Sequence, residues 1–437
     1  MQGIKLYPNS KIYIFAPKGV HSGGPTLLHQ LASAIVKNVT TSMDKNSIEP
    51  EIVYYSIDFK NTTENAYCEY HIKKAIGLQD TPQNIAIIPE ASTQFLYKFK
   101  NIQRVIWWMS VDNYVRDVAV AYAEIYNKRM FKSLPILAKF NFTDKENFFH
   151  FVQSRYALDF LRLNNVSDEK ISYLSDYLEP VFLQKAKNVD ITKKEKIVAY
   201  NPKKGMEFTE KIINFASNMN FIPIQNMTPE EVEELLSRAM VYIDFGSHPG
   251  KDRIPREAAA LGCAVITGKR GAAENDEDIP IDAEFKFNDD ENEIPNIVNK
   301  INEIFDNFPE NHTKFQHYRE IIFNEPQKFY QDVIKVLNLN PEKKFTTVAI
   351  LQSGEKAKVC KELLKRLPQL KLVFAVGENI DDIEGISLKD AAFLYNEGRI
   401  DKFIVANVTA DEKDEISSKL DSMKVSYKNC ITIDYKG

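Results

Sequence analysis

The sequence predicts an α/β protein with two doubly wound parallel-sheet domains and a third, smaller α/β domain. Three observations support this fold class. Short β-type runs alternate with helical patterns along most of the chain, which is typical of parallel sheets joined by crossover helices. The 437 residues exceed what one hydrophobic core usually supports. A polar, proline-containing segment at 338–344 separates the last part of the chain from the rest.

The first domain is expected over residues 1–185. Its strands are predicted from apolar runs that each end in turn or helix-start residues. They are Lys11–Ala16, Glu51–Ile57, Asn84–Ile88, Arg104–Met109 and Phe148–Gln153. A helix over Thr26–Val36 is expected after the first strand.

The second domain is expected over residues 186–340. Its predicted strands are Ile197–Tyr200, Phe221–Ile224, Val241–Phe245, Cys263–Thr267 and Glu284–Phe287, and its predicted helices are Glu207–Asn218, Pro229–Arg238, Ile254–Leu261, Ile294–Phe305 and Gln327–Leu337. Thr228, with Glu231 three residues on, predicts a capping box before the second of these helices.

The third domain is expected over residues 345–437. Its predicted elements are the strands Thr346–Leu351, Lys371–Val376, Lys402–Ala406 and Cys430–Asp434 and the helix Ala357–Leu367. Its first strand leads into the position of a dinucleotide loop, but only one glycine, Gly354, stands there. We therefore expect this domain to serve protein interaction or scaffolding instead of nucleotide binding.

Composition excludes several classes of protein. The chain carries 56 Lys and Arg against 61 Asp and Glu, a net charge of -5, which argues against a nucleic-acid binder. Its four cysteines lie far apart without zinc spacing, which fits a reducing compartment. The first residues lack the pattern of a signal peptide, and no apolar run approaches the ~20 residues of a membrane span. A cytoplasmic protein is expected.

Two glycines mark the first candidate site. Gly23 and Gly24 stand between an apolar strand and a helix, where backbone N–H groups and the helix N-terminus can bind an anion such as a diphosphate. Glycines that merely form the turn would give the same pattern. His21 beside them is a secondary catalytic candidate, although a loop histidine is more often structural.

Most of the residues that suggest a ligand-binding site lie in the segment 241–267. An apolar strand ends at the loop Gly246–Asp252, and a helix with Pro255 near its first turn follows. Ligands of open α/β sheets bind at this carboxyl edge of the strands. The Glu257 carboxylate at the helix start suits ribose hydroxyls, and basic side chains suit phosphate. These basic residues are Lys251, Arg253 and Arg256. An isolated Arg-Glu pair would instead be interpreted as a solvated helix end.

The same segment resembles the donor-binding region of glycosyltransferase family 4. The likeness consists of the strand, the small-residue loop, Arg256-Glu257-Ala258-Ala259, the pair Gly262-Cys263, the next apolar strand and Gly271-Ala272-Ala273-Glu274. In architecture it covers about residues 10–338. It implies the GT-B fold, in which two Rossmann-like domains face a cleft that binds a nucleotide sugar.

The resemblance implies roles for single residues. Glu257 would hold the nucleotide ribose, and Gly271, Ala272, Ala273 and Glu274 would lie beside the donor sugar. The turn Asn201–Gly205 is similar to the family's Lys-Gly turn, so Lys204, and with it Lys203, would contact the donor diphosphate, which Gly23 and Gly24 would face from the other domain. The catalytic candidates are therefore Glu257, Lys204, Arg256 and His21.

One departure from the family concerns the donor sugar. The family usually carries a Glu-x7-Glu pair, but the position eight residues before Glu257 is Pro249. The first acid, which normally touches the sugar, is missing. Asp244 and Asp252 are the nearby carboxylates.

The expected reaction is sugar transfer from a nucleotide-sugar donor to a glycan, lipid-linked or other acceptor. Lysine and arginine can stabilise the departing diphosphate without a metal, and no Asp-x-Asp motif stands at the site, so no metal and no cofactor is expected. The resemblance also implies a hexosyltransferase that retains anomeric configuration, in bacterial polysaccharide biosynthesis. Two alternatives stay open: a catalytically silent GT-B partner or acceptor-binding subunit, and a less favoured sugar-nucleotide epimerase.

The acceptor-binding candidates follow strands of the first domain. Glu90, Asp112 and Asn113 stand at strand ends, where they bind the acceptor or simply cap the next helix. Residues 128–140 mix basic and large apolar side chains, as a segment on the inner membrane face would. A buried helix–loop edge has the same composition and is favoured. Peripheral membrane contact, and a protein partner for the C-terminal domain, stay open.

Overall fold

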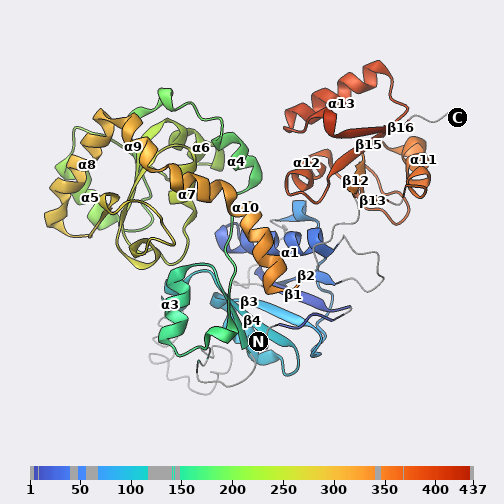
Figure 1. Cartoon of the computed structure of the whole chain (residues 1–437), viewed down its shortest axis with the longest axis horizontal. Helices are drawn as coiled ribbons and strands as arrows, with labels where there is room; N and C mark the ends of the chain where they lie inside the picture. Colours follow the sequence, from blue (N-terminus) through green and yellow to red (C-terminus); the bar gives the residue numbers. More distant parts are fainter. Residues whose placement is uncertain are drawn as a thin grey trace. The chain divides into compact units, whose positions relative to one another are not determined.

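The computed structural model describes residues 4–7, 9–39, 48–55, 67–116, 140, 142, 148–339, 346–367 and 369–433. The chain divides into two compact units, one made of Met1–Ile4 and Asp80–Asp332, the other of Lys5–Gln79 and Val333–Gly437. Strands and helices alternate in both units, and the described strands form parallel sheets (Figure 1). The predicted α/β class is confirmed. The boundaries at 1–185, 186–340 and 345–437 stay a prediction.

The N-terminal sheet has the strand order β2-β1-β3-β4-β5-β6. Its strands are mostly buried, as expected for parallel strands covered on both faces. Trp107 and Trp108 on β4 are fully buried, and their indole N–H groups donate to Leu174 O at 3.2 Å and to His150 Nδ1 at 3.0 Å. The elements around this sheet are β1 Lys11–Pro17, α1 Gly23–Val39, β2 Glu49–Tyr55, η1 Cys68–Tyr70, β3 Ile85–Pro89, η2 Glu90–Lys98, β4 Gln103–Trp108, β5 Phe148–Val152, α3 Arg155–Leu163, η4 Asp168–Lys170 and β6 Ile171–Tyr173.

The second sheet has the strand order β11-β10-β9-β7-β8. The strand order reverses at β7, so crossover helices are expected on both faces of the sheet. α5 packs beside α8, and α6 packs beside α7 (Figure 1). Thr228 forms the predicted capping box with Glu231 at the start of α6. The elements are α4 Pro180–Ala186, η5 Ile191–Lys193, β7 Glu195–Tyr200, α5 Met206–Phe215, β8 Asn220–Pro223, α6 Pro229–Arg238, β9 Ala239–Asp244, α7 Arg253–Ala260, β10 Ala264–Gly268, η6 Gly271–Glu274, η7 Ala283–Phe285, β11 Lys286–Phe287, η8 Glu291–Glu293, α8 Ile294–Asp306, α9 Phe308–Lys314 and α10 Gln316–Val336.

The third sheet has the order β14-β13-β12-β15-β16. At its dinucleotide-loop position, Gly354 N donates to Glu378 Oε1 at 2.5 Å. A carboxylate of the protein thus occupies the helix N-terminus where a phosphate would bind; the expectation that this module binds no nucleotide stays a prediction. The elements are β12 Thr346–Ile350, α11 Gly354–Leu364, β13 Leu370–Val376, β14 Gly385–Ile386, α12 Leu388–Asn396, β15 Lys402–Ala406, α13 Ala410–Ser422, η9 Tyr427–Asn429 and β16 Cys430–Ile433.

The helix predictions differ from the structure at two ends. α1 begins at Gly23, three residues before the predicted Thr26, because Pro25 is tolerated in the first turn of a helix. α10 begins at Gln316 and runs through Pro326, whereas the sequence predicted a helix only after that proline. A proline removes one backbone bond of a helix. Tertiary contacts of Glu325, described below, hold α10 at this position.

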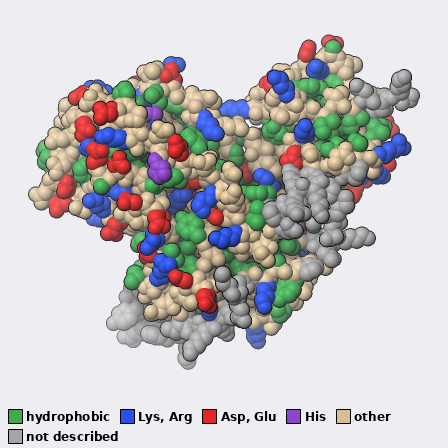
Figure 2. Space-filling view, viewed as in Figure 1, with side chains coloured by type: hydrophobic (Ala, Val, Ile, Leu, Met, Phe, Trp, Pro, Cys, Tyr) green, Lys and Arg blue, Asp and Glu red, His purple; other side chains and the backbone are tan. Residues whose placement is uncertain are grey.

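The surface of the second sheet's helices mixes both signs of charge. Figure 2 shows acidic and basic side chains interspersed over the visible face of α5, α8 and α9, the pattern of a solvated surface. In the part of the chain that the structure describes, none of the helices combines the length and the apolar character that a membrane span requires. The candidate membrane-contacting segment, 128–140, lies outside the described residues except for Phe140, which is buried.

Candidate functional site

The strand order of the second sheet defines where a ligand can bind. In a doubly wound sheet, ligands bind outside the carboxyl ends of the strands, at the point where the strand order reverses. Here that point lies between β7 and β9. The turn Asn201–Gly205 follows β7, and the loop Gly246–Asp252 follows β9. Both basic motifs singled out in the sequence therefore lie at one edge of this sheet.

The two loops touch through their glycines. Gly205 and Gly246 have φ of 62° and 106°, in the left-handed region that favours glycine. A Cβ on Gly205 would lie 1.8 Å from Phe245 O, and one on Gly246 would lie 2.7 Å from Gly205 N. The backbones are therefore in direct contact, and this contact fixes the loops that carry Lys204 and Asp252.

We expect Gly205→Ala to lower the free energy of unfolding by about 3 kcal/mol, because overpacking and a left-handed non-glycine residue each cost about 1–3 kcal/mol. Urea unfolding followed by circular dichroism measures the change. Gly77→Ala is the matched control, because no atom lies within 4 Å of its added Cβ. Equal stability of the two variants would contradict the close contact.

Lys204 is held by two carboxylates and a histidine. Its Nζ donates to Asp252 Oδ2 at 2.5 Å and lies 3.4 Å from Asp244 Oδ2. His248 Nδ1 lies 3.5 Å from the same Nζ and 2.8 Å from Asp252 Oδ2. We call Asp244, His248 and Asp252 the Lys204 cage. Within it Lys204 keeps 21% of its side chain exposed, so the ammonium is fixed but reachable.

Opposite charges dominate the electrostatics of the cage. Burial alone would lower the pKa of Lys204, but Asp244 and Asp252 raise it above its ordinary value, so the lysine is charged. Burial would raise the pKa of Asp252, yet the hydrogen bond from His248 and the charge of Lys204 hold it below its ordinary value. Burial raises the pKa of Asp244, although Lys204 opposes this.

The cage residues also have ligand atoms suited to a metal ion. One atom from each of Asp244, His248 and Asp252 lies within 4.8 Å of the others, and carboxylate with imidazole is a common donor set. The Lys204 ammonium, however, already contacts these ligand atoms. The Lys204 ammonium therefore takes the place that a metal ion would have among these ligand atoms. A metal-free reaction stays our prediction.

We expect Mn²⁺ to bind the Lys204→Met variant about tenfold or more tightly than the wild type, because even in water two unit charges about 4 Å apart repel by about 1 kcal/mol. Isothermal titration calorimetry with MnCl₂ alone measures both affinities. Tighter Mn²⁺ binding to the wild-type protein would show that the ammonium is not the resident cation.

Glu257 lies on α7, one turn after Arg253. Arg253 Nε donates to Glu257 Oε1 at 3.4 Å, and Arg253 Nη2 also pairs with Glu179. The Glu257 side chain is 19% exposed. Burial raises the pKa of Glu257, Arg253 opposes this shift, and Glu179 adds to it. A shielded but reachable carboxylate of this kind can accept hydrogen bonds from ligand hydroxyls.

We expect Glu257→Gln to raise the melting temperature at about pH 8 but not at about pH 4. The raised pKa means that the folded chain holds the Glu257 proton more tightly than the unfolded chain. That stabilisation is complete below the ordinary pKa of 4.5 and is lost as the pH rises through the raised pKa. Glutamine does not ionise, so the variant does not lose this stability at high pH. Thermal unfolding at both pH values checks this, and a lower melting temperature of the variant at pH 8 would contradict it.

Arg256 and Lys251 belong to a buried network with two carboxylates. Arg256 is fully buried, and it donates to Asp176 Oδ2 at 2.5 Å and to Glu325 Oε2 at 2.8 Å. Lys251 Nζ lies 2.6 Å from Glu325 Oε1. We call Asp176, Lys251, Arg256 and Glu325 the Arg256 network. These contacts favour a structural role for Arg256 over direct contact with a donor phosphate; its predicted catalytic role stays a prediction.

The segment after β10 packs against the Lys204 cage. Gly271 has φ of 60°, and a Cβ there would lie 2.2 Å from His248 O. Ala272 N donates to the same oxygen at 2.9 Å. Ala272 and Ala273 are fully buried, whereas Glu274 is exposed. The backbone of η6 therefore holds His248, and Glu274 is the side chain of this segment that a ligand can reach. Lys203, on the turn after β7, is exposed as well.

The acceptor candidates engage neighbouring elements. Glu90 is buried, and its Oε2 accepts from Met109 N at 3.1 Å. Asp112 Oδ1 accepts from the Tyr156 hydroxyl at 2.7 Å, and Oδ2 accepts from Ser247 Oγ. Asn113, next to it, is half-buried. Asp112 thus ties β4 to the loop after β9, and Glu90 caps the end of β4.

Gly23 and Gly24 belong to the other compact unit, where they form the first turn of α1 at the carboxyl end of β1. The preceding residue, Ser22, donates its N–H to the Tyr67 hydroxyl at 3.3 Å. The ring of His21 lies 5.3 Å from the ring of Tyr67. The first turn of α1 thus carries the backbone N–H groups that anion binding requires.

Sequence reasoning named Asp244 and Asp252 as nearby carboxylates, but it missed that they hold Lys204. It also missed His248, Asp176 and Glu325. His248 stands four residues from both Asp244 and Asp252, a spacing that could have indicated the cage. Asp176 and Glu325 have no local signal, because they pair with Arg256 from positions 80 and 69 residues away.

No family model matches this chain, and no curated protein matches its sequence. Solved structures that it resembles include HepE of Anabaena in complex with UDP-glucose, with a TM-score of 0.48, 10% identity and coverage of 75% of this chain and 99% of that chain. Sucrose-phosphate synthase of Thermosynechococcus elongatus has a TM-score of 0.47 at 13% identity, with 75% and 97% covered. A glycosyltransferase of Rickettsia africae has a TM-score of 0.44 at 11% identity, with 75% and 100% covered. All three TM-scores lie below 0.5.

Proposed function

We propose that this protein is a glycosyltransferase that moves a sugar from a nucleotide-sugar donor to a glycan, lipid-linked or other acceptor, without a metal and with retention of configuration. Glu257 binds the ribose of the donor, and Lys204 binds its diphosphate. The observation that carries the proposal is their placement: a fixed, charged lysine follows β7 and a shielded carboxylate follows β9, on either side of the point where the strand order reverses.

The chemistry of transfer fits these two side chains. The bond between the anomeric carbon and the donor diphosphate breaks, and its electron pair goes to the diphosphate oxygen. A new bond forms to an acceptor hydroxyl oxygen, whose proton passes to the departing diphosphate. Negative charge develops on the diphosphate, where a pre-positioned ammonium stabilises it. The Lys204 cage holds that ammonium in one place before the donor binds, which removes reorganisation from the reaction step.

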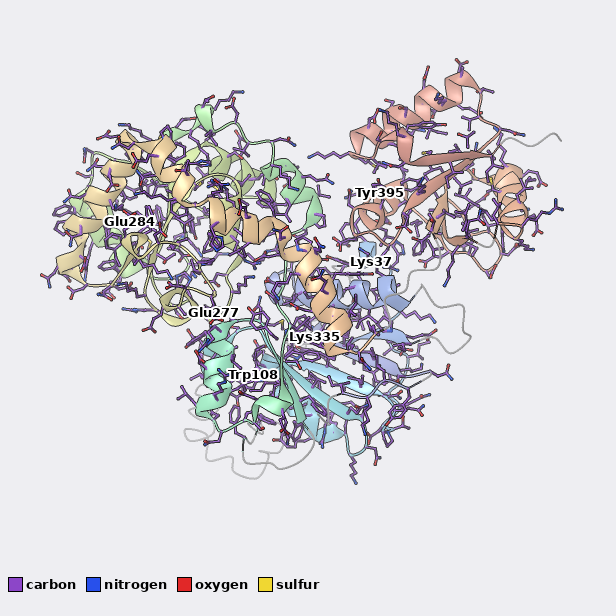
Figure 3. The ribbon with its side chains drawn as sticks, viewed as in Figure 1. Lys37, Trp108, Glu277, Glu284, Lys335 and Tyr395 are labelled. Carbon is purple, nitrogen blue, oxygen red and sulfur yellow. The ribbon has the colours of Figure 1, made fainter. Side chains whose placement is uncertain are left out.

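A donor screen tests the proposal. We expect one of UDP-, GDP-, ADP- or dTDP-sugars to raise the melting temperature of the full chain. Glu257→Gln should weaken this binding about ten- to a hundredfold, because a hydrogen bond to a charged group contributes about 1.5–3 kcal/mol. Glu284→Gln, which removes an acid on the second sheet's periphery paired with Lys300 and Lys314 (Figure 3), is the matched control. Binding of none of these donors would refute donor use and favour a silent partner subunit.

A further inference from the structure

One face of α10 is polar where it lines an open cavity. His317, Glu320, Asn324 and Lys328 recur at spacings of three and four residues, so they share one face of the helix. With residues at the end of β6 and of the loop after β9, they line an open cavity of about 350 Å³. All four side chains are exposed, so they form the open side of the cavity. Their polar groups can contact the hydroxyl groups of a ligand there. We call this space the α10 cavity.

The buried side of the cavity is built from part of the Arg256 network, including Glu325 of α10 itself. Asp176 and Lys251 line the cavity with 7% and 9% of their side chains exposed, and Glu325 lines it with 2% exposed. Asp176 Oδ1 is buried and accepts no hydrogen bond from the described residues, and Lys251 Nζ lies 4.0 Å from it. A buried carboxylate oxygen without a hydrogen bond lowers the stability of the fold by about 1–3 kcal/mol. The hydroxyl group of a ligand in the cavity would donate the missing hydrogen bond.

The charges around the cavity select a neutral ligand. Four carboxylates line it against the ammonium groups of Lys251 and Lys328, which disfavours phosphates and other anions. Lys328, whose Nζ lies 5.3 Å from the centre of the Tyr173 ring, and Lys251 offset part of this negative charge and repel a cation placed beside them. Hydroxyl groups both donate and accept hydrogen bonds, so they match a lining of carboxylates, amide and ammonium groups. The volume lies within the usual range of small-molecule sites.

The cavity and the proposed donor site share one loop. Lys251 lines the α10 cavity, while the next residue, Asp252, holds Lys204. Arg256 of the network precedes Glu257 on α7. Glu277, which also lines the cavity, lies beside α3 (Figure 3) and accepts from Arg155 Nη1 at 2.6 Å. A ligand in the cavity would therefore lie next to the backbone that positions both donor-binding side chains.

We propose that the α10 cavity binds a neutral saccharide, which Asp176, Glu320 and Asn324 hold through its hydroxyl groups. Assignment of this saccharide as the acceptor end of the transfer reaction rests on the proposed function; its binding does not. None of Glu90, Asp112 and Asn113 lines this cavity.

Saturation-transfer NMR on the full chain, without any nucleotide, tests the proposal. The probes are glucose, galactose, mannose, N-acetylglucosamine and maltose, with glucuronate and glucosamine as charged counterparts. We expect saturation transfer to at least one neutral sugar. Asn324→Phe, at an exposed position of the polar face of α10, should fill the cavity and weaken this binding at least tenfold. Gln331→Phe, exposed on α10 but outside the cavity, should leave it unchanged.

The outcomes separate this proposal from the donor proposal. Saccharide binding that is lost in Asn324→Phe and retained in both Gln331→Phe and Glu257→Gln supports the α10 cavity, whatever the donor screen shows. Binding to none of the neutral sugars, binding of a charged sugar alone, or binding that survives in both Asn324→Phe and a second cavity variant, Glu320→Leu, overturns it. Donor binding without saccharide binding would leave the proposed function standing and the α10 cavity refuted.

Discussion

Arg256→Met will lower the free energy of unfolding by about 3–5 kcal/mol, because it leaves two buried carboxylates without their main partner. Asp176 and Glu325 each accept a hydrogen bond from the Arg256 guanidinium, and the Arg256 side chain has no exposed surface. Burial would lower the pKa of Arg256, but these two acids raise it, which is the mark of strong mutual stabilisation. Urea unfolding followed by circular dichroism at neutral pH measures the loss.

Two comparisons decide whether the loss comes from buried charge. Arg238→Met removes an exposed arginine that pairs with Glu195, so it should change stability little. The triple variant Arg256→Met, Asp176→Asn, Glu325→Gln removes both uncompensated charges and should recover much of the stability, since replacing a whole buried ion cluster is often close to neutral. A triple variant no more stable than Arg256→Met would contradict this explanation.

Lys204→Met will lower the turnover number about 10²–10³-fold in an assay of nucleotide release from the identified donor, the usual effect of removing one pre-positioned group that stabilises developing charge. The loss should fall mainly on kcat, because the diphosphate gains its negative charge as the bond to the sugar breaks. Asp244 and Asp252, left without the ammonium, would add repulsion toward the diphosphate.

Lys203→Met is the matched control for this variant. Lys203 is the neighbouring basic residue, but it is exposed and lies outside the Lys204 cage. We expect it to change the turnover number less than tenfold, as one exposed charge near a ligand contributes little. Full activity of Lys204→Met would remove Lys204 from the reaction, and an equal loss in both variants would show that the cage gives Lys204 no special role.

Local patterns in the sequence predicted most elements of the sheets. The ends of the strands β7, β9 and β10 were predicted within two residues. Each strand is an apolar run that ends in or before glycine, asparagine or aspartate, and this pattern can be recognised from neighbouring residues in the chain alone. The short strands β6 and β14 were missed, since a run of two or three residues carries no period. The length of α10 was also missed, because Pro326 is a strong local signal for a helix boundary.

By itself, the sequence determined the fold class and the two loops on which the candidate donor site lies, since both follow from periodicity, turn residues and the order of strands. Only the tertiary structure decided what the basic side chains of those loops contact. Lys204 is held by its cage and remains reachable, whereas Arg256 and Lys251 are paired with Asp176 and Glu325. These pairings join residues far apart in the chain, and the free energy of a charge depends on burial and on partners that no local pattern encodes.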